Sequence, residues 1–136
     1  MANERLTFGE LSMEVLATAD STRGAMTAIV ETPPLADTPA HVHANEDELF
    51  VALEGEHAIT VGDEETKIGP GEAVFAPRGI PHSQRRVVKG EGRIMFVCMP
   101  GGLESFFREL ARADADGTLG SDTYAAASER YGITWL

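Results

Sequence analysis

The chain has 136 residues, 43% of them hydrophobic, which is enough to bury one ordinary core without disulfide bonds. Its formal net charge of -11 argues against nucleic acid as a partner, because phosphate binding needs a basic surface. The single cysteine, Cys98, excludes an internal disulfide, and its apolar neighbours predict a buried thiol rather than a nucleophile.

Targeting and membrane segments are not expected. Residues 1–5 contain no basic region followed by an apolar stretch, so we expect no signal peptide. No apolar run approaches the ~20 residues that cross a bilayer. We therefore expect a cytoplasmic protein without a membrane partner.

Short apolar segments alternate with glycine, proline and acidic residues from about Leu6 to Met99. The expected strands, in chain order, are 13–17, 25–30, 41–43, 48–53, 58–61, 73–76, 82–88 and 93–99. Turns are expected at 62–65 and 69–71, and Pro33-Pro34 interrupts regular structure. Many short, evenly spaced strands with no helical period between them predict an antiparallel sandwich or barrel.

The last third of the chain has a helical pattern. Apolar residues recur at helical spacing at Leu103, Phe106, Phe107 and Leu110. This predicts an amphipathic helix over 103–113, followed by a polar linker over 113–120. Ser121 is expected to cap a second short helix that ends near Arg130, with Gly132 just past its end. We expect both helices to pack on the outside of the barrel.

Three of the four histidines occur in a pattern that can gather ligands for a metal ion. His41 and His43 are two residues apart, so in a strand they project from the same face. Glu48 opens the next expected strand and His82 follows a later turn, so both can return to the same point. Imidazole and carboxylate donors without thiolate suit one divalent transition metal: Fe, Mn, Ni, Co, Cu or Zn. Open positions beside four protein ligands favour catalysis over a purely structural site.

The remaining polar residues have simpler interpretations. His57 is expected to face solvent, and the acids of Glu46-Asp47 and 63–65 are expected to be solvated turn charges. A short basic cluster consists of Arg85, Arg86, Lys89 and Arg93. We interpret these residues as solvated side chains on two strands around a turn. The alternative is that Arg86 or Arg93 turns inward to meet an anionic substrate group.

The candidate ligands stand within two longer motifs. Residues 41–55 read H-x-H-x4-E-x6-G and resemble the first motif of the cupin superfamily, and residues 71–82 read G-x5-P-x-G-x2-H and resemble the second. The resemblance covers roughly residues 8–102. It departs from the family pattern at Leu35, where the first motif often has glycine, and at Arg86, where the second often ends with asparagine.

This resemblance implies an all-β fold, a cupin jelly-roll barrel with a metal ion near its middle. It implies that the ligands are His41, His43, Glu48 and His82. It divides the chain into a barrel over 1–102 and a C-terminal helical extension over 103–136. Residues 100–107 are similar to small bacterial single-domain cupins described as quercetin-dioxygenase-like. By analogy with the family we expect a homodimer formed by pairing of N-terminal strands.

Three functions stay open. The first is a metal-dependent, dioxygenase-like oxygenase acting on a small organic molecule, phenolic or enolisable, in which Glu48 either remains a ligand or serves as general base. The second is a non-redox isomerase, lyase or cyclase that uses the metal as a Lewis acid. The third is a module that binds a small molecule without turnover.

A substrate pocket is expected to be lined by Phe50, Phe75, Gln84, Met95 and Phe96. Alternation along the strands places Phe50 on the face of Glu48 and Gln84 on the face of His82. Barrel packing alone would explain the apolar members of this set. Gln84 is more informative, because an inward amide needs a hydrogen-bond partner such as a ligand, a water or the substrate.

Overall fold

The computed structural model describes residues 3–33, 38–87 and 92–136. The strands are β1 (Glu4–Phe8), β2 (Leu11–Ala17), β3 (Thr27–Glu31), β4 (His41–His43), β5 (Asp47–Glu54), β6 (His57–Val61), β7 (Glu64–Ile68), β8 (Ala73–Ala76), β9 (His82–Arg86), β10 (Arg93–Met99) and β11 (Ile133–Trp135). The helices are α1 (Glu104–Ala115) and α2 (Ser121–Tyr131). The expectations for Pro34, Leu35, Val88 and Lys89 lie outside the described residues.

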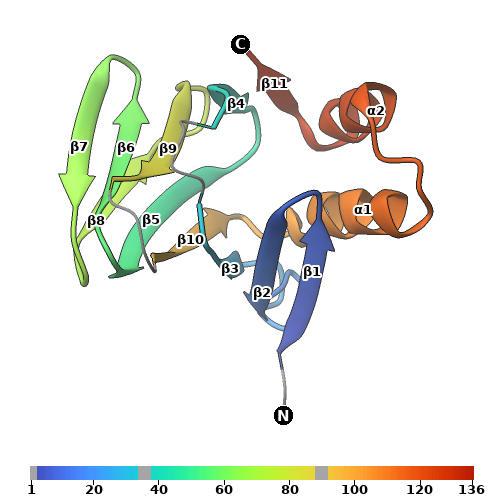
Figure 1. Cartoon of the computed structure of the whole chain (residues 1–136), viewed down its shortest axis with the longest axis horizontal. Helices are drawn as coiled ribbons and strands as arrows, with labels where there is room; N and C mark the ends of the chain where they lie inside the picture. Colours follow the sequence, from blue (N-terminus) through green and yellow to red (C-terminus); the bar gives the residue numbers. More distant parts are fainter. Residues whose placement is uncertain (1–2, 34–37, 88–91) are drawn as a thin grey trace.

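The strands form two antiparallel sheets. One has the order β1-β2-β3-β10-β5-β8 and the other β11-β4-β9-β6-β7. Every pairing between described strands is antiparallel. In Figure 1 the β6–β7 hairpin lies at one side of the molecule, and the β1–β2 hairpin with both helices lies at the other. This arrangement confirms the predicted all-β jelly-roll class with short C-terminal helices.

The core follows the two-residue period of the strands. In β5 and β10, buried and partly buried residues alternate, so every second side chain points between the sheets. Phe50 and Phe96 stand directly opposite each other in the ladder, and both are buried. Because cross-strand neighbours of this kind pack closely, they hold β5 and β10 together on the inner face.

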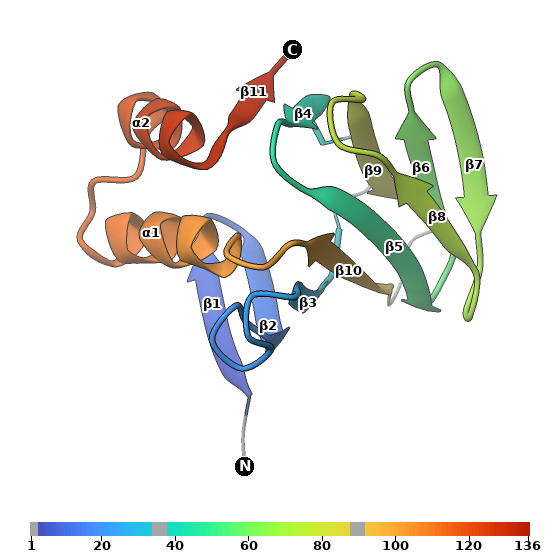
Figure 2. The same ribbon diagram turned by 180° about the vertical axis from the view of Figure 1, so that it is seen from behind.

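The C-terminal segment packs back on both sheets, as the reverse view shows (Figure 2). The ring of Phe107 in α1 stacks on Phe8 of β1, with 6.2 Å between centroids. Gly132 ends α2 in the left-handed conformation, with φ of 71°, and β11 then pairs with β4. The N-cap of α2 is Gly120 and not Ser121, because the Gly120 backbone N–H donates to the Thr123 hydroxyl.

The expected strands and helices all occur within a few residues of their predicted bounds. β1, β7 and β11 were not predicted. Two of them, β1 and β7, are rich in charged residues and expose most of their length, so they lack an apolar run. The third, β11, has only three residues. No helix among the described residues is long and apolar enough to cross a membrane.

Candidate metal centre

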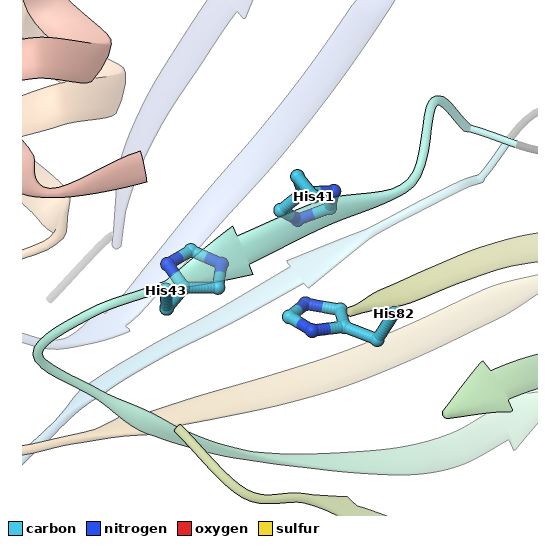
Figure 3. Close-up of side chains that lie close together, drawn as sticks. All are labelled: His41, His43 and His82. Carbon is cyan, nitrogen blue, oxygen red and sulfur yellow. The ribbon is translucent and has the colours of Figure 1, made fainter. Parts of the chain in front are cut away.

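Three histidines meet where β4 pairs with β9. His41 and His82 stand opposite each other in the ladder, and His43 is two residues along the same strand as His41. One ring nitrogen from each of the three lies within 4.8 Å of the others. Figure 3 shows His41 and His43 on one strand and His82 reaching toward them from the neighbouring strand. The predicted meeting of these three side chains is therefore present.

Glu48 of β5 reaches the same cluster from the other sheet. Its Oε1 lies 3.2 Å from Nε2 of His43 and 3.3 Å from Nε2 of His82. All three side chains are buried. Glu48 Oε1 and His82 Nε2 nevertheless lack a partner in hydrogen-bond geometry among the described residues. Buried polar atoms without hydrogen-bond partners indicate that another group binds between them.

The cluster strongly perturbs its titratable groups. Burial, reinforced by the nearby imidazole of His82, lowers the pKa of His41 to about 4. Burial opposes protonation of His43, but the carboxylates of Glu46 and Glu48 outweigh it and raise its pKa to about 9. Burial would raise the pKa of Glu48, yet the imidazoles of His43 and His82 outweigh it and lower that pKa. Glu48 is therefore an anion held against two imidazoles.

The outer ring nitrogens meet backbone and carboxylate oxygens. Nδ1 of His41 donates to the carbonyl oxygen of Pro39 at 2.9 Å. Nδ1 of His43 lies 3.6 Å from Oε1 of Glu46. Such contacts orient an imidazole and leave its Nε2 free for a metal. The interpretation of Glu46 as a solvated turn charge is wrong, because Glu46 is 8% exposed and turned toward His43.

Asp47, the neighbour of Glu46, does stay at the surface. It accepts hydrogen bonds from the backbone and guanidinium of Arg78. This pairing joins the loop after β8 to the start of β5, beside the cluster. Glu46 precedes β5, which begins at Asp47, so the path of the chain between β4 and β5, and not the strand period, turns only Glu46 inward.

A cavity of about 550 Å³ opens onto the cluster. His41, His43 and Glu48 form part of its wall. Most other lining residues are apolar or aromatic and come from both sheets and both helices: Phe8, Leu11, Met13, Phe96, Leu103, Phe106, Phe107, Leu110, Tyr124, Ala125, Ile133 and Trp135. A largely apolar cavity with a few convergent polar groups is typical of a small-molecule site.

The predicted pocket residues divide into three groups. Gln84 and Phe96 line the cavity. Phe50 is fully buried and packs against the His82 ring at 5.6 Å between centroids, but it does not line the cavity. Met95 and Phe75 lie outside it; Phe75 is 50% exposed. Their neighbours Phe96 and Ala76 are buried, so alternation turns Met95 and Phe75 outward.

Glu31 is a cavity residue that the sequence analysis missed. It ends β3 and lines the cavity beside Gln84, whose Nε2 donates to Glu31 Oε1 at 2.6 Å. Burial raises the pKa of Glu31 to about 7. The expected strand stopped at residue 30, because an acid after an apolar run resembles the end of a strand. The partner required by the inward amide of Gln84 is therefore a carboxyl group.

His57 does not face solvent, contrary to the prediction. It is fully buried, and its Nε2 donates to the Glu54 carbonyl oxygen at 2.8 Å. In β6 it stands opposite Arg86, four residues from Val61, which stands opposite His82. This places His57 far along the ladder from the cluster, so the fourth histidine belongs to the core.

The described members of the basic cluster make local contacts. Arg93 forms an exposed ion pair with Glu54 at 3.4 Å, so the alternative that it turns inward is wrong. Arg85 lies 3.5 Å from Glu65. Nε of Arg86 donates to the Pro33 carbonyl oxygen at 2.8 Å. None of these three residues lines the cavity.

The chain is similar to known proteins over the same region. Residues 28–98, just over half of the chain, match the family model of the cupin domain. Quercetin 2,3-dioxygenase from Bacillus subtilis (strain 168) is 28% identical over 108 residues, which cover 79% of this chain and 32% of that protein. The chain thus spans about a third of the length of this curated relative.

Solved structures agree with the fold. The protein TT1209 from Thermus thermophilus is 35% identical, with a TM-score of 0.52 over 57% of this chain and 74% of that one. KdgF from Halomonas sp. is 14% identical, with a TM-score of 0.64 over 75% of this chain and 90% of that one. A predicted oxalate decarboxylase from Thermotoga maritima is 21% identical, with a TM-score of 0.60 over 74% and 93% of the two chains. The last two likenesses concern the fold alone.

Proposed function

The chain belongs to the cupin family, and we propose that it is a metal-dependent oxygenase acting on a small organic molecule, phenolic or enolisable. The observation that carries the proposal is a buried cluster of imidazole and carboxylate groups in the wall of an apolar cavity. Similarity to a quercetin 2,3-dioxygenase supports the choice of an oxygenase.

The donor atoms fit a divalent transition metal. Buried Glu48 Oε1 and His82 Nε2 lack hydrogen-bond partners among the described residues, and an ion held by His41, His43, Glu48 and His82 would satisfy both. Three imidazoles and one carboxylate suit Fe, Mn, Co, Ni, Cu or Zn. When bound, the metal would supply a Lewis acid for a substrate oxygen and, if redox-active, a path for electrons to O2.

The protein's own groups have separate tasks. Glu48 forms part of the cavity wall and is ionised, so we assign to its carboxylate the proton of a substrate hydroxyl, although its lowered pKa makes it a weak base while it faces the two imidazoles. The aromatic lining, which includes Phe96, Phe106 and Trp135, gives the cavity an apolar surface that can pack against a ring. Substrate deprotonation and orientation are thus the contributions that we assign to the chain itself.

A second candidate is a non-redox isomerase, lyase or cyclase with the same ligands. The observation in its favour is Glu31, a cavity residue whose pKa is raised by burial to about 7. A group with this pKa can both give and take a proton near neutral pH, as such reactions require.

The test is elemental analysis of untagged protein, followed by oxygen uptake with quercetin as probe. We expect about one transition metal ion per chain, lost in His43→Ala, Glu48→Ala and His82→Ala, and O2 consumption by the wild type. His57→Asn is the matched control, because it alters a histidine outside the cluster and should retain the metal. Bound metal without oxygen uptake would favour the second candidate. No metal, even after reconstitution, would refute both and favour a binding module.

We also propose that the protein is a cytoplasmic homodimer. β1 is an outer strand of the six-stranded sheet, and an unpaired edge favours pairing with a second copy. Light scattering during size-exclusion chromatography should give twice the chain mass. Because proline cannot donate a ladder hydrogen bond, Thr7→Pro in β1 should shift this mass toward the monomer. A monomeric wild type would refute the proposal.

A further inference from the structure

One hydrogen-bonded polar pair interrupts the apolar part of the cavity wall. Gln84 of β9 and Glu31 of β3 both line the cavity, and they come from different sheets. The two residues are 9% and 7% exposed. Apolar packing does not require an amide and a carboxyl group at such positions, because burial of polar groups costs free energy unless they are paired.

The pairing leaves one atom of Gln84 unused. Its Nε2 donates to Oε1 of Glu31 at 2.6 Å, which fixes the plane of the amide. The other end of the amide, Gln84 Oε1, is buried and accepts no hydrogen bond among the described residues. A buried carbonyl oxygen in a cavity wall calls for a donor from a molecule in that cavity.

This acceptor lies on the same strand face as the histidine cluster. Gln84 follows His82 by two residues, so the two side chains share a face with roughly 7 Å between their backbone positions. Aromatic residues, among them Phe96 and Trp135, line the same cavity. The cavity wall therefore presents two polar positions, the histidine cluster and Gln84 Oε1, roughly 7 Å apart along β9, a separation that a small ring system can span.

We infer that the substrate carries oxygen groups at both ends of an aromatic ring system: one faces the histidine cluster, and the other is a hydroxyl that donates to Gln84 Oε1. Gln84 is then a specificity-determining residue. Glu31 is a positioning residue that holds the amide with its acceptor toward the cavity. This inference rests on the proposed function in requiring that the cavity take a small organic substrate.

The experiment compares two aromatic probes by calorimetry, without O2 and with the protein as purified. 2,6-Dihydroxynaphthalene has hydroxyls at opposite ends of its fused rings, and 2-naphthol has only one. We expect the diol to bind the wild type about tenfold more tightly, because 2-naphthol leaves the buried carbonyl of Gln84 unpaired.

Variants assign this preference to the pair. Gln84→Met should bind both probes equally, and so should the double variant Glu31→Leu/Gln84→Met, which leaves no buried carboxylate unpaired. Glu31→Gln should keep the preference, since its amide oxygen still accepts from Gln84 Nε2, whereas Glu31→Leu should weaken it. Ser83→Ala changes the neighbouring polar residue of β9, which does not line the cavity, and should leave the preference unchanged.

The outcomes separate this inference from the proposed function. Equal binding of the two probes to the wild type, a preference that survives in Gln84→Met, or no binding of either probe would overturn the inference. None of these results depends on oxygen chemistry. A Gln84-dependent preference in a protein that consumes no O2 would refute the oxygenase and leave the inference standing.

Discussion

Raising the pH from 5 to 8 should change the difference in stability between Glu31→Gln and the wild type in favour of the variant. Burial raises the pKa of Glu31 from 4.5 to about 7. At pH values between these two pKa values, the folded state therefore binds more protons than the unfolded state. The free energy of unfolding therefore falls as pH rises through this range. At about 1.4 kcal/mol for each pKa unit, the full effect is about 3 kcal/mol.

The assay is urea unfolding of wild type and Glu31→Gln at pH 5 and pH 8, with both proteins stripped of metal by a chelator. Other titrating groups are shared, so their effects largely cancel in the comparison. The unfolding free energy of the variant minus that of the wild type should rise by up to about 3 kcal/mol when the pH is raised from 5 to 8. Glu10→Gln, which changes an exposed acid, is the control and should show no such movement. An equal difference at both pH values would mean that Glu31 ionises as an ordinary solvated acid, and would refute this reasoning.

Three further results are expected. Phe50→Ala should lower the free energy of unfolding by about 3–5 kcal/mol, because the Phe50 side chain is fully buried. Phe75→Ala, at an exposed position, should lower it by under about 1 kcal/mol. Chemical denaturation measures both losses, and equal losses would contradict the assigned burial. Glu46→Gln should lower the pKa of His43, followed by NMR titration of the metal-free protein, and an unchanged pKa would show that Glu46 does not act on this ring. Gly132→Ala should destabilise the protein by about 1 kcal/mol, because its φ of 71° is left-handed; an unchanged melting temperature would contradict this.

The sequence alone was sufficient to predict the strands that carry the histidine cluster. The spacing of His41 and His43 determines that both side chains leave one face of a strand, whatever the rest of the fold does. The two motifs, with their glycine and proline turns, also located Glu48 and His82 correctly beside them. The two helices were likewise local features, since the apolar spacing of the first and the terminal Gly132 of the second are visible in the chain itself.

The tertiary structure decided which polar residues are buried and with whom they pair. Glu46 and Asp47 are adjacent acids, yet only Glu46 turns toward His43, and no local pattern distinguishes them. Glu31 and Gln84 are far apart in the chain and meet only because their two sheets face each other across the cavity.

The C-terminal segment shows the same division between local and long-range information. Helical spacing predicted α1, and the cap and the terminal glycine predicted α2, but only the pairing of β11 with β4 brings Trp135 opposite His41 and into the cavity wall. Strand period and turn residues act over a few positions, so the sequence determines them directly. Partners across sheets depend on the register and packing of the whole barrel, and for that reason the polar pair and the cavity emerged only from the fold.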